Sequence, residues 1–195
     1  MSVTSNSEGN SGWESVGTAD QAKKAVLVAA AGNISIKSPN GAYYPGASPN
    51  VIGVMNYTKG TNGKVLSSTS KYSSAYDLCA PGVDWMSANG KDKDGYIEMS
   101  GTSMASPVVA FGAALRLLKS RAYANANPSA EELTPTELAK EVREAVEKDS
   151  VVKTLTSEKY DAFDMCKLVE NEEAAVKISL CEDSEGGLEQ RMNNV

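Results

Sequence analysis

The residues best suited to chemistry lie in the stretch 101–107, which reads Gly-Thr-Ser-Met-Ala-Ser-Pro. A strand-like run at 96–99 precedes it, and apolar residues at helical spacing follow it. A strand, a turn of small residues and a helix place a serine at a helix N-terminus, where backbone N–H groups are unpaired and the helix dipole is positive. These donors would stabilise negative charge that develops on an attacked carbonyl. A serine in this stretch would be well placed to attack a carbonyl, and Pro107 is expected in the first helical turn.

An alternative interpretation is that Thr102 or Ser103 only caps the helix, because Ser and Thr are preferred at that position. A second stretch, 28–33, favours catalysis: it reads Val-Ala-Ala-Ala-Gly-Asn and predicts a strand that ends in an amide side chain. The carboxyl ends of parallel strands form the rim where α/β proteins bind ligands. Asn33 and the N–H of Ser103 would together form a two-donor oxyanion hole. The alternative for Asn33 is a purely structural turn.

The composition narrows the class of protein. The chain has 195 residues, of which 41% are hydrophobic, and a net charge of −6. This length predicts one core with at most a small appendage. The sequence has no apolar run long enough to span a membrane and no basic block, which argues against nucleic acid as a partner. Its three cysteines are far apart and predict neither a disulfide framework nor a zinc site, so we interpret Cys79 as a buried hydrophobe.

The sequence contains no histidine, which is the usual base that activates a serine nucleophile. A Ser-x-x-Lys match at 68–71 offers another base, as in the penicillin-binding and β-lactamase signature. Its companion motifs are absent, and it lies in a serine-rich loop instead of opening a helix. The activation of Ser103 is therefore not explained by this chain alone.

The predicted elements alternate in the manner of an α/β protein. Continuous apolar runs indicate buried parallel strands, and the segment 57–64 has the composition of a turn. A helix is expected from about 104 to 123, and another begins with Thr134 as N-cap, Pro135 at the first position and Glu137 at the third. Expected strands cover 25–31, 51–55, 76–80, 83–87 and 96–99, the last two forming a hairpin.

These motifs together resemble the subtilisin-like serine peptidases. The stretch 101–107 is similar to the nucleophile motif of that family, and 29–33 is similar to its oxyanion strand. The loop and strand from Tyr44 to Ile52 and the segment 77–82 match two further motifs in the family's order. The resemblance covers roughly 3–146 and implies a mostly parallel sheet with helices on both faces, here without the first strands of the fold.

The resemblance implies a serine endopeptidase that works through an acyl-enzyme, with Ser103 as nucleophile and Asn33 as oxyanion donor. It implies no required cofactor, but it allows a weak structural Ca²⁺ or monovalent cation, held by three backbone carbonyls and one carboxylate. The residues implied for the substrate are Ala30, Ala31 and Gly32 around its side chain and Ser7 and Gly9 along its backbone, and those for the cation are Gly46, Ser48, Val51 and Asp77.

The chain also departs from the family pattern. The catalytic Asp and His of the family lie upstream of the substrate-binding edge, and this sequence begins at about that edge. We therefore expect a partial peptidase domain at 1–168 and an acidic, loosely ordered tail at 169–195. The expected partners are a polypeptide substrate and an upstream segment or companion chain that carries Asp and His; alone, the chain should be nearly inactive. A family member would be secreted, although the first residues do not read as a signal peptide, so localisation stays open.

Two rival hypotheses remain. The first is a catalytically dead protease-like scaffold that binds peptides, which would tolerate loss of Ser103. The second is a fragment that never folds stably and has no function. Because a scaffold does not need Ser103 together with Asn33 and their small neighbours, the sequence favours the enzyme hypothesis.

Overall fold

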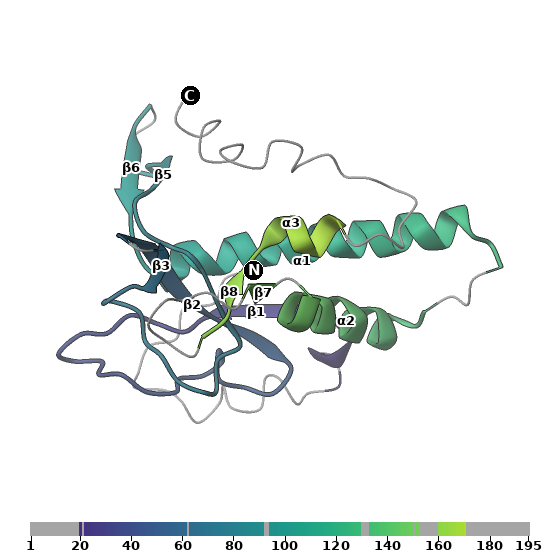
Figure 1. Cartoon of the computed structure of the whole chain (residues 1–195), viewed down its shortest axis with the longest axis horizontal. Helices are drawn as coiled ribbons and strands as arrows, with labels where there is room; N and C mark the ends of the chain where they lie inside the picture. The colour runs from purple at the N-terminus through teal and green to yellow at the C-terminus, as the bar shows by residue number, and fades with distance from the viewer. Residues whose placement is uncertain are drawn as a thin grey trace.

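The computed structural model describes residues 20, 22–61, 63–91, 94–129, 133–149, 151–152 and 160–170 (Figure 1). All structural statements below concern these residues. Almost all of the expected tail lies outside them. The predicted boundary at 168 falls inside a short helix, α3 (Met165–Glu170).

A six-stranded sheet forms the centre of the molecule, and its main strands are parallel. The strands β1, β2 and β4 lie side by side in parallel, because β1, β4 and the first six residues of β2 are uncharged and can be buried on both faces. The strand β8 extends the sheet in parallel beyond β4, while β7 and β3 pair antiparallel with β8 and β2. Their bounds are Leu27–Ala30 (β1), Val51–Gly60 (β2), Gly63–Leu66 (β3), Leu78–Pro81 (β4), Val151–Val152 (β7) and Ala162–Phe163 (β8).

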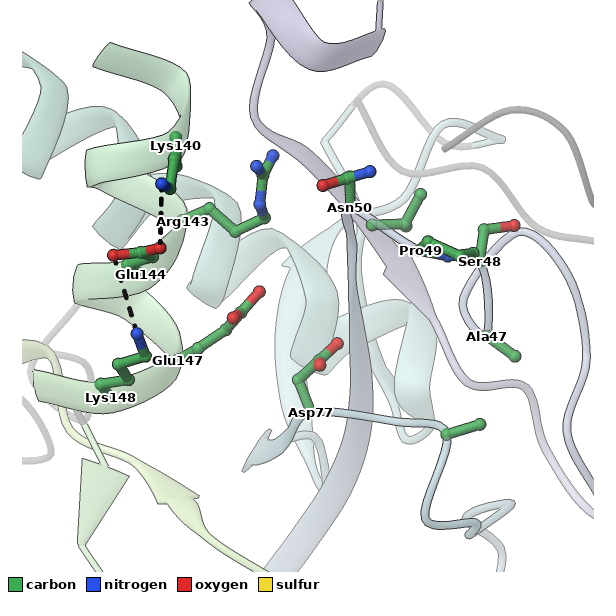
Figure 2. Close-up of a pocket in the computed structure, with 12 residues that line it drawn as sticks. Ala47, Ser48, Pro49, Asn50, Asp77, Lys140, Arg143, Glu144, Glu147 and Lys148 are labelled. Atoms are coloured by element: carbon green, nitrogen blue, oxygen red, sulfur yellow. Dashed lines mark ion pairs between the residues drawn. The ribbon is translucent and has the colours of Figure 1, made fainter. Parts of the chain in front are cut away.

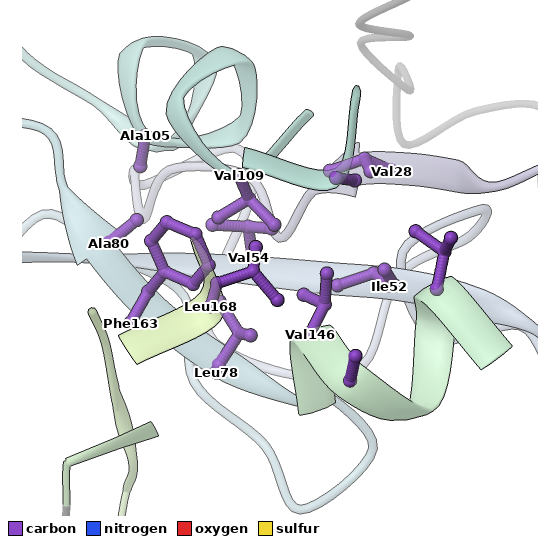
Figure 3. Close-up of a cluster of buried hydrophobic side chains, with 13 residues drawn as sticks. Val28, Ile52, Val54, Leu78, Ala80, Ala105, Val109, Val146, Phe163 and Leu168 are labelled. Atoms are coloured by element: carbon purple, nitrogen blue, oxygen red, sulfur yellow. The ribbon is translucent and has the colours of Figure 1, made fainter. Parts of the chain in front are cut away.

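Helices cover one face of this sheet. The long helix α1 (Thr102–Ala126) packs against β1, β2 and β4, and α2 (Pro135–Glu144) continues as a π-helical turn, η4 (Ala145–Asp149). Figure 3 shows the buried hydrophobic cluster between these helices and the sheet, which includes Val109 of α1, Val54 of β2 and Val146 of η4. The mostly parallel α/β fold predicted from the sequence is confirmed, although the helices were expected on both faces and those of the described residues pack on one.

The opposite face of the sheet is covered by loops within the described residues. There Met55 and Cys79 pack with Tyr76, and partly buried side chains from neighbouring loops, such as Ala47, complete the cluster. Cys79 is fully buried, as its apolar neighbours predicted. This second cluster holds the loop 41–49 against the strands.

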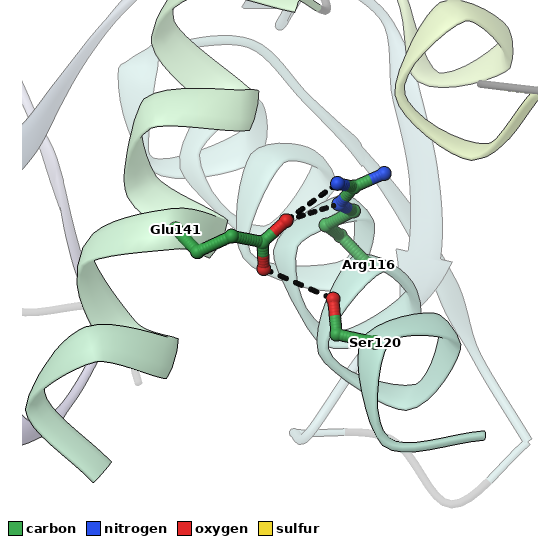
Figure 4. A network of polar contacts seen from close by, with 3 residues as sticks. All are labelled: Arg116, Ser120 and Glu141. Carbon is green, nitrogen blue, oxygen red and sulfur yellow. Dashed lines mark hydrogen bonds and ion pairs between the residues drawn. The ribbon is translucent and has the colours of Figure 1, made fainter. Parts of the chain in front are cut away.

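Local sequence signals explain how the helices begin and pack. The predicted capping box of α2 is confirmed: the Thr134 hydroxyl accepts a hydrogen bond from the Glu137 N–H, and the Glu137 carboxylate accepts one from the Thr134 N–H. Figure 4 shows how α2 is joined to α1, because the Glu141 carboxylate accepts hydrogen bonds from both Arg116 and Ser120. These hydrogen bonds hold α2 against the second half of α1.

Two expectations about local structure are wrong. The segment 57–64 is not a simple turn: β2 continues to Gly60 and pairs with β3 in a hairpin. Pro107 is not in the first helical turn either, because α1 begins at Thr102 and the proline is its sixth residue. The missing N–H of Pro107 therefore leaves the carbonyl of Ser103 without its usual helical donor.

The remaining hairpin agrees with the prediction. The strands β5 (Trp85–Ala88) and β6 (Tyr96–Met99) pair antiparallel and lead directly into the start of α1. A short 3₁₀ turn, η3 (Ala22–Lys24), precedes β1 and packs against α2. Within the described part of the chain, we find no helix with the length and apolar character that crossing a membrane would require.

Candidate active site

The end of β1 and the start of α1 meet through a hydrogen bond between Asn33 and Thr102. The Asn33 Oδ1 accepts a hydrogen bond from the Thr102 N–H at 3.1 Å, and the Thr102 hydroxyl lies 3.3 Å from the same oxygen. The Gly32 N–H donates in turn to the Thr102 hydroxyl at 3.0 Å. Thr102 is fully buried, so these bonds lock two segments about seventy residues apart into one rigid corner.

The geometry of Asn33 leaves its amide nitrogen available. Because Oδ1 must face the Thr102 N–H, Nδ2 points the other way, and it has no hydrogen-bond partner among the described residues. Asn33 is solvent-exposed, so this donor can reach a bound molecule. The purely structural role considered for Asn33 explains its oxygen but not its free N–H₂ group.

Gly101 allows Asn33 to approach the helix start. The N-cap of α1 is Gly101, with φ 151° and ψ 172°, a conformation that is close to exclusive to glycine. A Cβ at this position would lie 2.7 Å from the Asn33 Nδ2. The helix therefore has no side-chain cap of its own, and Asn33 caps it from another strand. The alternative interpretation, that Thr102 or Ser103 is the N-cap, is wrong.

Ser103 is the second residue of α1 and is half-buried. Its N–H lies in the first turn and so has no acceptor within the helix. Its hydroxyl forms no hydrogen bond within the described residues, so no side chain described here acts as its base. The structure thus places a serine hydroxyl, a helix N-terminus and an amide donor at one corner of the molecule.

The residues predicted around the substrate side chain lie directly before Asn33. Ala30 and Ala31 are buried and Gly32 is half-buried, and the Ala31 carbonyl accepts a hydrogen bond from the Tyr76 hydroxyl at 3.0 Å. Burial raises the pKa of Tyr76 to about 12, so this phenol stays protonated and remains a donor. Ser7 and Gly9, predicted along the substrate backbone, lie outside the described residues.

Three of the four predicted cation ligands line a separate cavity of roughly 510 Å³ (Figure 2). Ser48, Val51 and Asp77 line it, whereas Gly46 does not and instead packs beneath β2 at Gly53. The Asp77 Oδ2 accepts a hydrogen bond from the Gly53 N–H at 2.7 Å, and its Oδ1 has no hydrogen-bond partner among the described residues. A carboxylate oxygen is a type of ligand that hard cations prefer.

Two acidic side chains face each other across this cavity. Burial raises the pKa of Asp77, while the Gly53 N–H and the charge of Arg143 act in the opposite direction. Burial also raises the pKa of Glu147, and the negative charge of Asp77 raises it further. Arg143 is itself buried, and its Nη1 lacks a hydrogen-bond partner within the described part of the chain. Glu147 and Arg143 were not predicted from the sequence, because the packing of α2 over this loop depends on contacts between distant segments.

Thr102 and Tyr76 were also missed as supporting residues of the corner. Neither is distinctive in the sequence, since a threonine beside a serine and a tyrosine beside an aspartate fit many structures. The sequence signal closest to this corner is the glycine before Asn33, and in the structure Gly32 has φ 95°, a conformation that glycine adopts readily.

The fold and this corner define an α/β protein with a serine at a strand–turn–helix junction and an amide donor from a neighbouring strand. The family model of the subtilases, peptidase family S8, matches residues 1–164. The chain therefore belongs to the subtilase family, as the resemblance in the sequence implied.

Individual relatives agree with this assignment. The chain is 38% identical over 117 residues to thermitase from Thermoactinomyces vulgaris, a match that covers 60% of this chain and 39% of thermitase. The self-cleaved protease domain of PatA is 25% identical, with a TM-score of 0.59 over 85% of this chain and 56% of that one. The prenylagaramide maturation protease PagA shares the fold at 23% identity and a TM-score of 0.54, over 77% of this chain and 51% of that one. The chain thus spans between about two fifths and a little over half of these relatives.

Proposed function

We propose that this chain supplies the nucleophile and the oxyanion hole of a subtilisin-like serine endopeptidase. In the proposed reaction the Ser103 Oγ attacks a peptide carbonyl, and the C–N bond breaks to release the amine with a proton. Water then hydrolyses the acyl-enzyme to a carboxylate and free Ser103. The Asn33 Nδ2–H and the Ser103 N–H donate to the oxyanion in both steps.

The orientation of the Asn33 amide is the observation that carries this proposal. Its oxygen is held by the Thr102 N–H, so its N–H₂ group is fixed as a donor before any substrate binds. A donor fixed in this way needs no reorganisation when charge develops, and removing one such donor typically lowers kcat by about 10²–10³-fold. A purely structural asparagine would not require its nitrogen to be free.

We propose that the base and its orienting acid come from a companion segment. The sequence contains no histidine, and the Ser103 hydroxyl has no partner within the described residues. The exposed face of α1 supports such docking, because Phe111 and Leu118 are seven residues apart and are 55% and 59% exposed. The hairpin before α1 adds exposed Tyr96 and Met86. Without this segment the chain should show only residual activity.

The remaining predicted roles are proposals of the same kind. We propose that Ala30, Ala31 and Gly32 line the pocket for the substrate side chain, and that Ser7 and Gly9 pair with the substrate backbone. For the cavity near β2 we propose a weak structural cation on Asp77 and the carbonyls of Ser48 and Val51, whereas Gly46, also expected as a ligand, does not line this cavity. The Oδ1 of Asp77, which has no hydrogen-bond partner among the described residues, supports this. Such an ion would stabilise the loop and take no part in the reaction.

Hydrolysis of a labelled, denatured protein substrate tests the proposed function. The assay compares the chain alone with the chain joined to an Asp- and His-bearing segment taken from another subtilase, and Ser103→Ala in the joined protein is the control. We expect turnover only in the joined protein with Ser103, and we expect Asn33→Ala to lower its kcat by about 10²-fold or more. Saturable peptide binding by a folded joined protein without turnover would favour the peptide-binding scaffold instead.

A further inference from the structure

Lys71 is a buried cation beside the proposed oxyanion hole, and the proposed reaction does not use it. Its side chain is only 2% exposed. The Nζ donates hydrogen bonds to the carbonyl oxygens of Ser38, at 3.1 Å, and Pro39, and it lies 3.4 Å from the centre of the Tyr43 ring. Among the described residues no carboxylate forms an ion pair with it. Its charge is thus neutralised by backbone dipoles and a ring face, all from one loop.

The same residue also contacts the end of β1. The Lys71 N–H donates to the Gly32 carbonyl at 2.9 Å. A Cβ on Gly32 would lie 3.1 and 3.2 Å from the Cδ and Cε of Lys71, so the lysine stem covers this glycine closely. Gly32 directly precedes Asn33 and donates its own N–H to Thr102. Lys71 therefore joins the loop 38–43 to the residue that sets the direction of Asn33.

We propose that Lys71 is a positioning residue for the oxyanion hole. Its ammonium holds the loop 38–43 against Gly32, and this packing keeps the Asn33 Nδ2 directed at the position of the oxyanion. The proposal rests on the proposed function in assigning that role to Asn33. Loss of the ammonium alone would remove the Nζ donor from the carbonyls of Ser38 and Pro39, and the Ser38 carbonyl would keep only its hydrogen bond from the Ser35 N–H, which would loosen the loop.

Hydrogen exchange of the full chain tests the contact itself. Lys71→Met keeps most of the stem and removes the charge, while Lys64→Met is the matched control, because Lys64 lies over the Tyr57 ring at 5.2 Å in the β2–β3 hairpin. We expect Lys71→Met to speed exchange of the Gly32 and Tyr43 amides by about tenfold or more, with β2 amides unchanged. Equal exchange in Lys71→Met and the unaltered chain would overturn the proposal.

A double-mutant cycle separates positioning from a merely structural role. The rate at which a fluorophosphonate probe labels Ser103 is measured in the joined protein, for Lys71→Met, Asn33→Ala and both together. If Lys71 acts through Asn33, Lys71→Met slows labelling by roughly 10–10²-fold, and it has little further effect once Asn33 is replaced. Additive effects would overturn the proposal.

Failure of the proposed function would be recognised separately. It would leave Ser103 unlabelled in every joined protein, including the one with Lys71 and Asn33 intact. The exchange experiment on the chain alone would then decide whether Lys71 holds Gly32 in place.

Discussion

Substitution of Gly101 by alanine should destabilise the chain and displace Asn33 together. At φ 151° and ψ 172° an alanine costs about 1–3 kcal/mol of backbone strain. Its Cβ would lie 2.7 Å from the Asn33 Nδ2, so the amide must move and weaken its hydrogen bond to Thr102, which is worth roughly 0.5–1.5 kcal/mol. Together these give a loss of about 1.5–4.5 kcal/mol in the free energy of unfolding, or roughly 3–18 °C in Tm.

Urea unfolding followed by circular dichroism measures this loss. Gly90→Ala is the matched control, because a Cβ there meets no atom within 4 Å, and it should change the free energy of unfolding by about 0.5 kcal/mol or less. In an Asn33→Ala background the clash is gone, so Gly101→Ala should cost only the backbone strain. A Gly101→Ala effect no larger than that of Gly90→Ala, or unchanged by Asn33→Ala, would refute the reasoning.

Three further predictions concern stability. Because the pKa of Glu147 is raised, folding favours its protonated form, and the free energy of unfolding should fall as pH rises from its ordinary pKa of 4.5 through the raised value. Glu147→Gln should flatten this pH dependence, which urea unfolding at several pH values measures. An unchanged slope would contradict the prediction. Gly112→Ala should cost about 1–3 kcal/mol, since its Cβ would lie 2.6 Å from the Phe163 ring, and a neutral result in urea unfolding would show that the ring yields freely. Thr134→Ala should cost about 1 kcal/mol through loss of the α2 cap, whereas Thr134→Ser should cost much less in the same assay.

The sequence predicted those parts of the fold in which local chemistry determines local structure. Uncharged apolar runs gave the buried parallel strands, and the Thr134–Pro135–Glu137 signal gave the start of α2, because both patterns act within a few residues. Ser103 and Asn33 were predicted together from their flanking strand and turn residues, and the structure brings their segments into contact.

The rest depended on contacts between distant segments. The cap of α1 comes from Asn33, so no inspection of the residues around Gly101 could identify it. The position of Pro107 was predicted wrongly for the same reason, because the helix begins where that distant cap is, at Thr102. The sequence indicated a role for Lys71 only through the Ser-x-x-Lys match at 68–71. Its contacts with Gly32 and the loop 38–43 form only in the folded chain.

Labelling of Ser103 by a fluorophosphonate probe tests the central claim most directly. Protein shown to be folded is treated with the probe, and mass spectrometry of its peptides locates the adduct in the chain alone, in Ser103→Ala, and in the chain joined to an Asp- and His-bearing segment. We predict an adduct on Ser103 in the joined protein and almost none in the chain alone. Rapid labelling of Ser103 in the chain alone would mean that another group serves as base, and an unlabelled Ser103 in the folded joined protein would contradict its assignment as nucleophile.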